Sequence, residues 1–154
     1  MSITSLLVEN RIFSQADITS KKRLLEFIAE KAAEELELPQ NAIYNKLLER
    51  ERLGSTGLGQ GIAVPHARLD NLKEAHACLV KLDEGINYDA IDKQSVDLIF
   101  ALFIPEESTE EHLQILAALA RIFSQKTVTD KIRVSSSALE IISHIQQAEL
   151  EQFK

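Results

Sequence analysis

The seven consecutive apolar residues from Leu98 to Ile104 constrain the fold of this chain more than any other segment. Together with Val96 they predict a β-strand over 96–104. Successive side chains of a strand point to opposite faces of its sheet, so a run without polar alternation indicates burial on both faces. The run is also far too short to cross a lipid bilayer. The sequence therefore predicts a central strand that is covered on both sides.

Apolar spacing predicts the elements that precede this strand. A helix is expected over about 20–37, and a second helix runs from Asn41, as N-cap, to about Arg52. The face that the second helix should bury consists of Ile43, Tyr44, Leu47 and Leu48. Short strands are expected at 62–64, where Pro65 ends the strand, and at 75–82.

Two capping boxes predict helices after the central strand. Ser108 with Glu111, and Ser137 with Glu140, have the spacing that satisfies the free N–H groups of a first helical turn. A short helix is expected between them at 127–134. The first helix should bury Leu113, Leu116, Ala117 and Ala120, with Ile122 as a further candidate, and the last should bury Ile141, Ile142 and Ile145. This order predicts an α/β fold, a mixed β-sheet flanked by helices on both faces.

The composition limits the classes of function. The 154 residues, 45% hydrophobic and 27% charged, predict one globular domain over 1–154. The net charge of −7 argues against nucleic-acid binding, because phosphate backbones favour a basic face. Cys78 is the only cysteine, which excludes an internal disulfide and favours a reducing compartment. Because residues 1–13 show no signal-peptide pattern, we expect a cytoplasmic protein without membrane insertion.

The segment from Gly54 to Gly61 holds four of the five glycines and is predicted to be a loop. A Walker A motif needs a Lys after its last glycine, whereas Gln60 follows Gly59. A dinucleotide-binding fingerprint needs GxGxxG between a strand and a helix, whereas here a helix precedes the glycines and a strand follows them. The sequence therefore excludes both nucleotide motifs.

A glycine-rich loop can still gather backbone N–H groups around an anion. Ser55 and Thr56 add hydroxyl donors, and Arg50 offers the charged fork of N–H groups that suits phosphate oxygens. His66, preceded by the rigid Pro65, is a nucleophile near pH 7 when its imidazole is neutral. These residue types suit phosphoryl transfer. The same pattern also fits an ordinary loop beside a structural histidine, and the residues alone leave both interpretations open.

A long segment that ends at His66 resembles the phosphorylation segment of enzyme IIA of the fructose/mannitol family in the phosphoenolpyruvate-dependent phosphotransferase system. It reads Arg50-Glu51, then Gly-Ser-Thr-Gly-Leu-Gly-Gln-Gly-Ile-Ala-Val-Pro-His66. The Gly-Ser-Thr-Gly form is most similar to the nitrogen-regulatory branch. The resemblance continues, over nearly the whole chain, at Ser20-Lys-Lys-Arg, Tyr88-Asp-Ala-Ile-Asp, Val96-Asp-Leu-Ile-Phe-Ala-Leu and Glu111-His112-Leu. The family's mixed sheet with helices on both faces agrees with the pattern above.

The resemblance implies roles for particular residues. His66 matches the phosphorylated histidine, expected to react through Nε2, and His112 matches a second active-site histidine that contacts the phosphoryl group. Arg50 matches an arginine near the site. Ala67 stands where many members have glycine, and its methyl group should alter the turn or a partner's approach. The phosphoryl group is expected to lie against the loop residues Ser55, Thr56, Gly57 and Gly59.

The same resemblance implies partners. An HPr-type phosphocarrier of the nitrogen branch (NPr) would donate the phosphoryl group, without a metal or other cofactor. The phosphorylation state would then control target proteins such as transporters or sensor kinases. Cys78 does not resemble the cysteine loop of enzyme IIB, so any such acceptor would be a separate protein. The alternative is a sugar-specific enzyme IIA that passes the phosphoryl group to a fructose or mannitol enzyme IIB.

The other histidines and arginines carry weaker signals. His76 and His144 have no partner at metal-ligand spacing and are assigned to structure or surface. A zinc site built from the four histidines is disfavoured by their irregular separations and by the lack of thiol ligands. A cationic rim around the site is expected from Arg50, Arg52 and Arg68.

Overall fold

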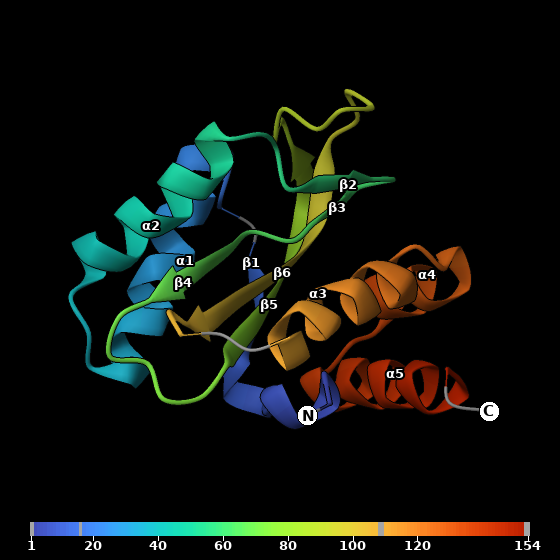
Figure 1. Ribbon diagram of the computed structural model, residues 1–154. Coiled ribbons are helices and arrows are strands. Elements are labelled where there is room, and N and C mark those ends of the chain that lie inside the picture. The colour runs from blue at the N-terminus through green and yellow to red at the C-terminus, as the bar shows by residue number, and fades with distance from the viewer. Residues whose placement is uncertain (1, 16, 108–109, 153–154) are drawn as a thin grey trace.

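The structure, a computed structural model, describes residues 2–15, 17–107 and 110–152 (Figure 1). Two short 3-10 helices, η1 (Thr4–Leu6) and η2 (Glu9–Arg11), come before the first strand. The later elements are β1 (Ile12–Gln15), α1 (Lys21–Leu36), α2 (Gln40–Arg52), β2 (Gly57–Gly59), β3 (Ile62–Ala63), β4 (His66–Leu69), β5 (His76–Ile86), β6 (Val96–Pro105), α3 (Glu110–Phe123), α4 (Lys126–Val134) and α5 (Ala138–Glu151).

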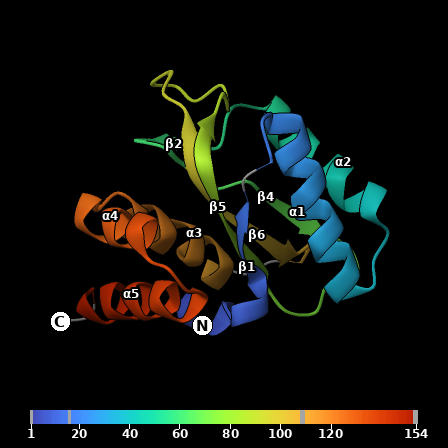
Figure 2. The same cartoon turned by 180° about the vertical axis from the view of Figure 1, so that it is seen from behind.

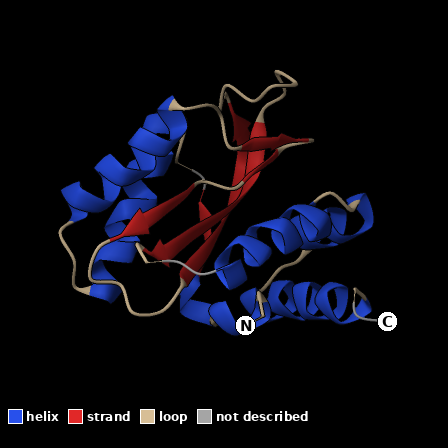
Figure 3. Cartoon of the chain, viewed as in Figure 1, coloured by secondary structure: helices blue, strands red, loops and turns tan. Residues whose placement is uncertain are grey.

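Within the described residues, six strands form one sheet, with β6 near its centre (Figure 3). β6 runs antiparallel to β5 and parallel to both β3 and β4. β1 runs parallel to its neighbour β5, and β2 runs antiparallel to its neighbour β3. The path across the sheet is β1-β5-β6-β3-β2, with β4 also beside β6. The sheet is therefore mixed, as the sequence predicted.

Helices cover both faces of the sheet. Figure 1 and Figure 2 show α1 and α2 on one face and α3, α4 and α5 on the other. From Leu98 to Ile104 the side chains of β6 alternate between two buried clusters, one under each helical layer. Toward α3–α5 they are Leu98, Phe100, Leu102 and Ile104, and toward α1 and α2 they are Ile99, Ala101 and Phe103, with Val96 also in that second cluster. The predicted burial of this strand on both faces is confirmed.

Strands β3 and β4 behave as one strand that is interrupted at Val64 and Pro65. Ile62 is in register with Leu98 of β6, and His66 is in register with Leu102, so the offset is the same on both sides of the interruption. Pro65 has no N–H to donate, but its carbonyl oxygen accepts from the backbone N–H of Leu102 at 3.0 Å. His66 is therefore the first residue of a strand held by the sheet.

The glycine segment folds back as a β-hairpin. Gln60 and Gly61, between β2 and β3, have φ values of 57° and 85°, and a two-residue hairpin turn requires such positive values. A Cβ on Gly57 would lie 2.8 Å from the Cβ of Ala90, so only glycine fits there. The prediction of a loop throughout 54–61 is therefore wrong over Gly57–Gly59.

The N-cap residues of α1 and α2 determine where these two helices begin. Ser20 caps α1, because its hydroxyl oxygen accepts from the N–H of Arg23 at 3.1 Å. α2 has Pro39 at its N-cap, so the prediction of Asn41 as N-cap is wrong. The extended backbone of Pro39 places its carbonyl oxygen 3.3 Å from the N–H of Ile43, which closes the first turn earlier than expected. On the predicted face of α2, Ile43 and Leu47 are buried, while Tyr44 and Leu48 are only half-buried.

The helices after the central strand agree with the prediction in position. The Ser137 hydroxyl oxygen accepts from the N–H of Glu140 at 3.2 Å and caps α5, as predicted, and α4 lies close to the expected short helix. Ile141 and Ile145 are buried, and Ile142 is half-buried. Ser108 and the side chain of Glu111, the predicted capping box of α3, lie outside the described residues.

Helix α3 turns a different face to the core from the one predicted. Leu113 is 52% exposed and Ala117 is exposed, so these two predictions of burial are wrong. The buried apolar residues are Ile115, Leu119, Ile122 and Phe123, of which Ile122 was a predicted candidate and is confirmed. Because α3 is apolar around most of its circumference, its periodicity does not select a single face. Leu116 and Ala120, both half-buried, border the site described next.

Candidate functional site

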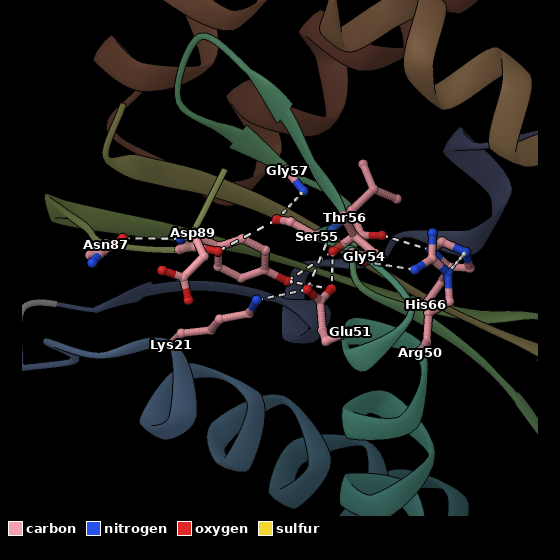
Figure 4. A network of polar contacts seen from close by, with 12 residues as sticks. Lys21, Arg50, Glu51, Gly54, Ser55, Thr56, Gly57, His66, Asn87 and Asp89 are labelled. Atoms are coloured by element: carbon pink, nitrogen blue, oxygen red, sulfur yellow. Dashed lines mark hydrogen bonds and ion pairs between the residues drawn. The ribbon is translucent and has the colours of Figure 1, made fainter. Parts of the chain in front are cut away.

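The imidazole of His66 is oriented by the interruption between β3 and β4. Its Nδ1 lies 2.8 Å from the carbonyl oxygen of Val64, to which Nδ1–H donates. This assigns the tautomer in which Nε2 carries the lone pair. Nε2 in turn accepts a hydrogen bond from Nε of Arg50 at 3.3 Å (Figure 4). Both ring nitrogens are therefore engaged, and the nucleophilic one faces an arginine.

The electrostatic environment keeps this ring neutral. Burial lowers the pKa of His66 below its usual value, the Val64 carbonyl oxygen raises it, the Arg50 guanidinium lowers it, and the Glu51 carboxylate raises it. The net direction is downward. At neutral pH Nε2 therefore carries a lone pair, which can attack an electrophile once the Arg50 N–H moves away from it.

Arg50 joins the end of α2 to the glycine segment. Besides its hydrogen bond to His66, its Nη1 donates to the carbonyl oxygen of Gly54 at 2.9 Å. Gly54 itself is at the sharp exit from the helix, where its N–H donates to the carbonyl oxygen of Glu51 at 3.1 Å. One guanidinium group thus fixes both the histidine and the start of the loop, and brings a positive charge to Nε2.

Ser55 and Gly57 lie at the start of the hairpin. The Ser55 hydroxyl oxygen accepts from the N–H of Gly57 at 3.1 Å, and its hydroxyl group donates to the carbonyl oxygen of Tyr88 at 3.5 Å. Ser55 therefore links the hairpin to the segment before β6. Ser55 and Gly57 both border the space beside Arg50, and the Ser55 hydroxyl and the Gly57 N–H are both hydrogen-bonded within the protein.

Thr56 also lines this space, but its N–H and hydroxyl are bonded to Glu51. Its hydroxyl donates a short hydrogen bond to Glu51 Oε1, and its backbone N–H donates to Oε2 at 3.3 Å. The same carboxylate accepts from the Tyr88 hydroxyl at 3.0 Å and pairs with Lys21 Nζ at 2.9 Å (Figure 4). Sequence reasoning missed Glu51, Lys21 and Tyr88 as site residues. Only the quoted Ser20-Lys-Lys-Arg, Arg50-Glu51 and Tyr88 segments of the family pattern contained them.

Two adjoining cavities open beside His66. The smaller, of 180 Å³, lies between the glycine segment and α3. The larger, of 440 Å³, lies between α2, β4 and α3. Both are bordered by Arg50, His66 and Leu116. The smaller also has Ser55, Thr56, Gly57, Leu58, Val64 and Ala120.

The predicted cationic rim is smaller than expected. Arg50 and Arg68 border the 440 Å³ cavity together with Lys46. Arg52 instead lines a different cavity, beside Lys21 and Lys22. α2 turns successive side chains in different directions, so Arg50 and Arg52 face different spaces.

The second predicted histidine, His112, is buried in the first part of α3 and lines a neighbouring cavity of 780 Å³. Glu106 borders both this cavity and the 440 Å³ cavity beside His66. The structure thus places His112 on the neighbouring side of the site, and places Arg50 against His66. Gly59, with φ of 93°, ends β2, and only Ser55, Thr56 and Gly57 of the predicted loop ligands line the 180 Å³ cavity.

The remaining candidates take structural positions. His76 is buried, with Nδ1 3.1 Å from Glu35 Oε2, and His144 is half-buried on α5. Burial raises the pKa of the Cys78 thiol to about 12, so this thiol is protonated and unreactive. Among the described residues, no group of three or more His, Cys, Asp or Glu side chains is placed to hold a metal ion. No helix in that part of the chain is long and apolar enough to span a membrane.

Comparison with known proteins identifies the family. A family model described as "Phosphoenolpyruvate-dependent sugar phosphotransferase system, EIIA 2" matches residues 5–148. A nitrogen regulatory protein of Escherichia coli (strain K12) is 39% identical over 150 residues, which cover 97% of this chain and 92% of that protein.

Solved structures share the fold. Nitrogen regulatory protein IIA-Ntr from Neisseria meningitidis superposes with a TM-score of 0.88 at 38% identity, covering 93% of this chain and 98% of that one. IIA mannitol from Escherichia coli superposes with a TM-score of 0.74 at 20% identity, covering 90% and 98%. The predicted enzyme IIA fold is confirmed. This chain belongs to the EIIA 2 family of the phosphoenolpyruvate-dependent sugar phosphotransferase system.

Proposed function

We propose that this chain is a cytoplasmic phosphocarrier of the nitrogen branch of the phosphotransferase system, and that it accepts a phosphoryl group on Nε2 of His66. The observation that carries the proposal is the hydrogen bond from Nδ1–H to the Val64 carbonyl oxygen. This bond leaves the lone pair on Nε2, which faces Arg50 and the adjoining cavities. The names of the similar proteins support the nitrogen branch.

The transfer requires one bond exchange. The lone pair on Nε2 attacks the phosphorus of a phosphohistidine on an HPr-type donor (NPr). The P–N bond of the donor breaks as the bond to His66 forms. The donor imidazole, which carries a proton on its other ring nitrogen, takes the electron pair and leaves as a neutral ring, and the positive charge passes to the phosphorylated ring of His66. His66 keeps its proton on Nδ1, hydrogen-bonded to Val64, so the step needs no net proton movement.

The neighbouring residues take separate parts in this proposal. Arg50 compensates the charge of the phosphoryl oxygens, as an electrostatic stabiliser of phosphoryl transfer must. Ser55 and Gly57 supply a hydroxyl and an amide to the same oxygens, which requires each donor to leave its present acceptor, the Tyr88 carbonyl oxygen or the Ser55 hydroxyl oxygen. His112 contacts the phosphoryl group from the neighbouring cavity. Thr56 holds the loop through Glu51.

Phosphorylation in solution tests the proposal. The protein is incubated with phosphoenolpyruvate, enzyme I and an HPr-type carrier, and its intact mass is measured before and after acid treatment. We expect one acid-labile phosphoryl group that maps to His66 and is missing in His66→Ala, while circular dichroism shows that the variant is folded. Phosphoryl incorporation in His66→Ala, or no incorporation into the folded wild-type protein with any carrier, would contradict the proposal.

The destination of the phosphoryl group separates regulation from sugar transport. We propose regulation of target proteins such as transporters or sensor kinases, because a dianionic group on a surface pocket changes what the surface can bind. Affinity capture with His66→Ala and with the charge mimic His66→Asp should then retain different proteins. A rapid chase of the phosphoryl group onto a purified fructose or mannitol enzyme IIB would instead support the sugar-specific alternative.

A further inference from the structure

Glu51 is a buried carboxylate that meets four donors, two on each oxygen. Oε1 accepts from the hydroxyls of Thr56 and Tyr88, and Oε2 accepts from the Thr56 N–H and pairs with Lys21 Nζ. Glu51 is 8% exposed, and Tyr88 is fully buried. Burial raises the pKa of Tyr88, so its hydroxyl remains protonated and is available as a donor. Four donors on one buried carboxylate fix its position tightly.

This carboxylate and Arg50 hold the same loop from two sides. Arg50 binds the Gly54 carbonyl oxygen and His66 Nε2, while Glu51, the next residue of α2, binds both polar groups of Thr56. Ser55 lies between the two anchored residues and lines the 180 Å³ cavity. The position of Ser55 relative to Nε2 is therefore set by the last turn of one helix.

Lys21 makes the arrangement possible electrostatically. An uncompensated carboxylate would be costly at this depth, and Lys21 supplies the opposite charge from the first turn of α1. Its ammonium group also lies 4.5 Å from the centroid of the Tyr88 ring. The pair thus ties α1, α2 and the segment before β6 to the loop beside His66.

We propose that Glu51 is a positioning residue of the phosphoryl-acceptor site. It fixes Thr56, and thereby Ser55 and Gly57, at the distance from His66 that transfer requires, and it balances the Arg50 charge at the imidazole. The inference rests on the proposed function of His66. It assigns to Glu51 a role in transfer that is separate from holding the fold together.

Glu149 provides a matched control within the same chain. It is also 8% exposed and also accepts from backbone N–H groups and a hydroxyl: from Ile3 N at 2.6 Å, from Thr4 N at 3.0 Å and from Thr4 Oγ1 at 2.7 Å. It anchors the N-terminal segment to α5. Glu149→Gln therefore removes a comparable buried carboxylate without touching the loop beside His66.

The test compares Glu51→Gln, Glu149→Gln and wild type in three measurements: unfolding in urea, the pKa of His66 by NMR, and the rate of phosphoryl transfer from the HPr-type donor. We expect both variants to lose stability. Only Glu51→Gln should lower the His66 pKa, and it alone should reduce the maximal transfer rate, by roughly 10- to 100-fold. The KM for the donor should change by less than about 2-fold, since binding and positioning are separate contributions.

The outcomes distinguish this inference from the proposed function. Equal behaviour of the two variants in transfer rate and in the His66 pKa would overturn the positioning role. Absence of transfer in wild type would overturn the proposed function, and the inference that depends on it. If Glu51→Gln does not fold, Tyr88→Phe removes one donor and keeps the carboxylate. Its transfer rate should then fall, and an unchanged rate together with an unchanged His66 pKa would overturn the inference.

Discussion

His66 and His76 lie on either side of strand β6, at neighbouring positions in its register. His66 pairs with Leu102 and His76 with Phe103, so their side chains point to opposite faces of the sheet. Burial lowers the pKa of both histidines. An arginine close to each, Arg50 or Arg11, lowers it further, and a glutamate, Glu51 or Glu35, raises it.

What separates them is the surroundings of the rings. His76 is 4% exposed, its Nδ1 lies 3.1 Å from Glu35 Oε2, and its ring centroid is 6.3 Å from that of Phe103. His66 is half-buried. Its Nδ1–H donates to a backbone carbonyl oxygen, and its Nε2 faces Arg50 beside two cavities. A lowered pKa therefore does not identify a reactive histidine. What distinguishes His66 from His76 in the structure is that its Nε2 faces two cavities and the Arg50 guanidinium.

Replacing each histidine by glutamine gives the largest expected contrast. His66→Gln should lose phosphoryl incorporation by more than about 1,000-fold, because the nucleophile is gone. His76→Gln should incorporate at the wild-type rate but unfold with about 1–3 kcal/mol less free energy, because the Glu35 partner is disturbed in the core. Intact mass and urea denaturation measure the two effects. Loss of phosphoryl incorporation in a folded His76→Gln variant would contradict the expectation that only His66 is required for transfer.

Replacing Arg50, the cation that contacts His66, tests the difference between the two histidines further. Arg50→Met should slow transfer by roughly 100- to 1,000-fold, the range seen when one donor to a developing charge is removed. It should also raise the His66 pKa, since Arg50 holds that pKa down. Arg68→Met, an exposed arginine that borders the same 440 Å³ cavity, is the matched control. Equal loss in both variants would mean that general positive charge, and not the contact with Nε2, supports transfer.

The two faces also differ in how far the sequence predicted them. The apolar run 98–104 predicted a strand buried on both sides, because that inference needs only the alternation of side chains along a strand. The face of α3 was mispredicted because Leu113, Leu116 and Ala117 are as apolar as the residues that are buried. Which apolar stripe meets the sheet depends on how α3 lies above it, and one stripe borders the cavities beside His66.

The site was predicted in part for a similar reason. The family resemblance supplied Arg50 and His66, which the structure brings into contact. The Glu51 cluster joins residues 21, 51, 56 and 88, from three separate segments of the chain. No local pattern connects them, so they emerge only when α1, α2 and the hairpin are packed together.

The pH dependence of stability tests whether both histidines are held neutral. Below about pH 6.5 these histidines take up protons more readily in the unfolded chain than in the folded chain. The unfolding free energy should therefore decrease as the pH is lowered. Each histidine contributes at most about 1.4 kcal/mol per pH unit, and above pH 6.5 neither contributes. Urea denaturation between pH 5 and 7.5 should show a shallower fall in His76→Gln than in wild type. An unchanged slope would mean that the folded chain protonates His76 as readily as the unfolded chain.

The smallest expected effect comes from Ala67, which follows His66 in the chain but belongs to the opposite face. Its methyl group is buried in the cluster under α1 and α2, and it pairs with Phe103, the residue that also pairs with His76. The expectation that Ala67 alters a turn is therefore wrong, because the residue lies within β4. Ala67→Gly should lower the unfolding free energy by about 1 kcal/mol, from the lost methyl contacts and the freer unfolded backbone.

The same substitution should leave the His66 side unchanged. We expect the His66 pKa and the transfer rate of Ala67→Gly to match wild type, while the NMR signals of the His76 ring shift, because the Phe103 ring between the two residues can relax into the vacated space. If transfer slows while the His76 signals stay in place, the methyl group acts on the donor's approach to His66, and the two faces of β6 are less separate than their contacts indicate.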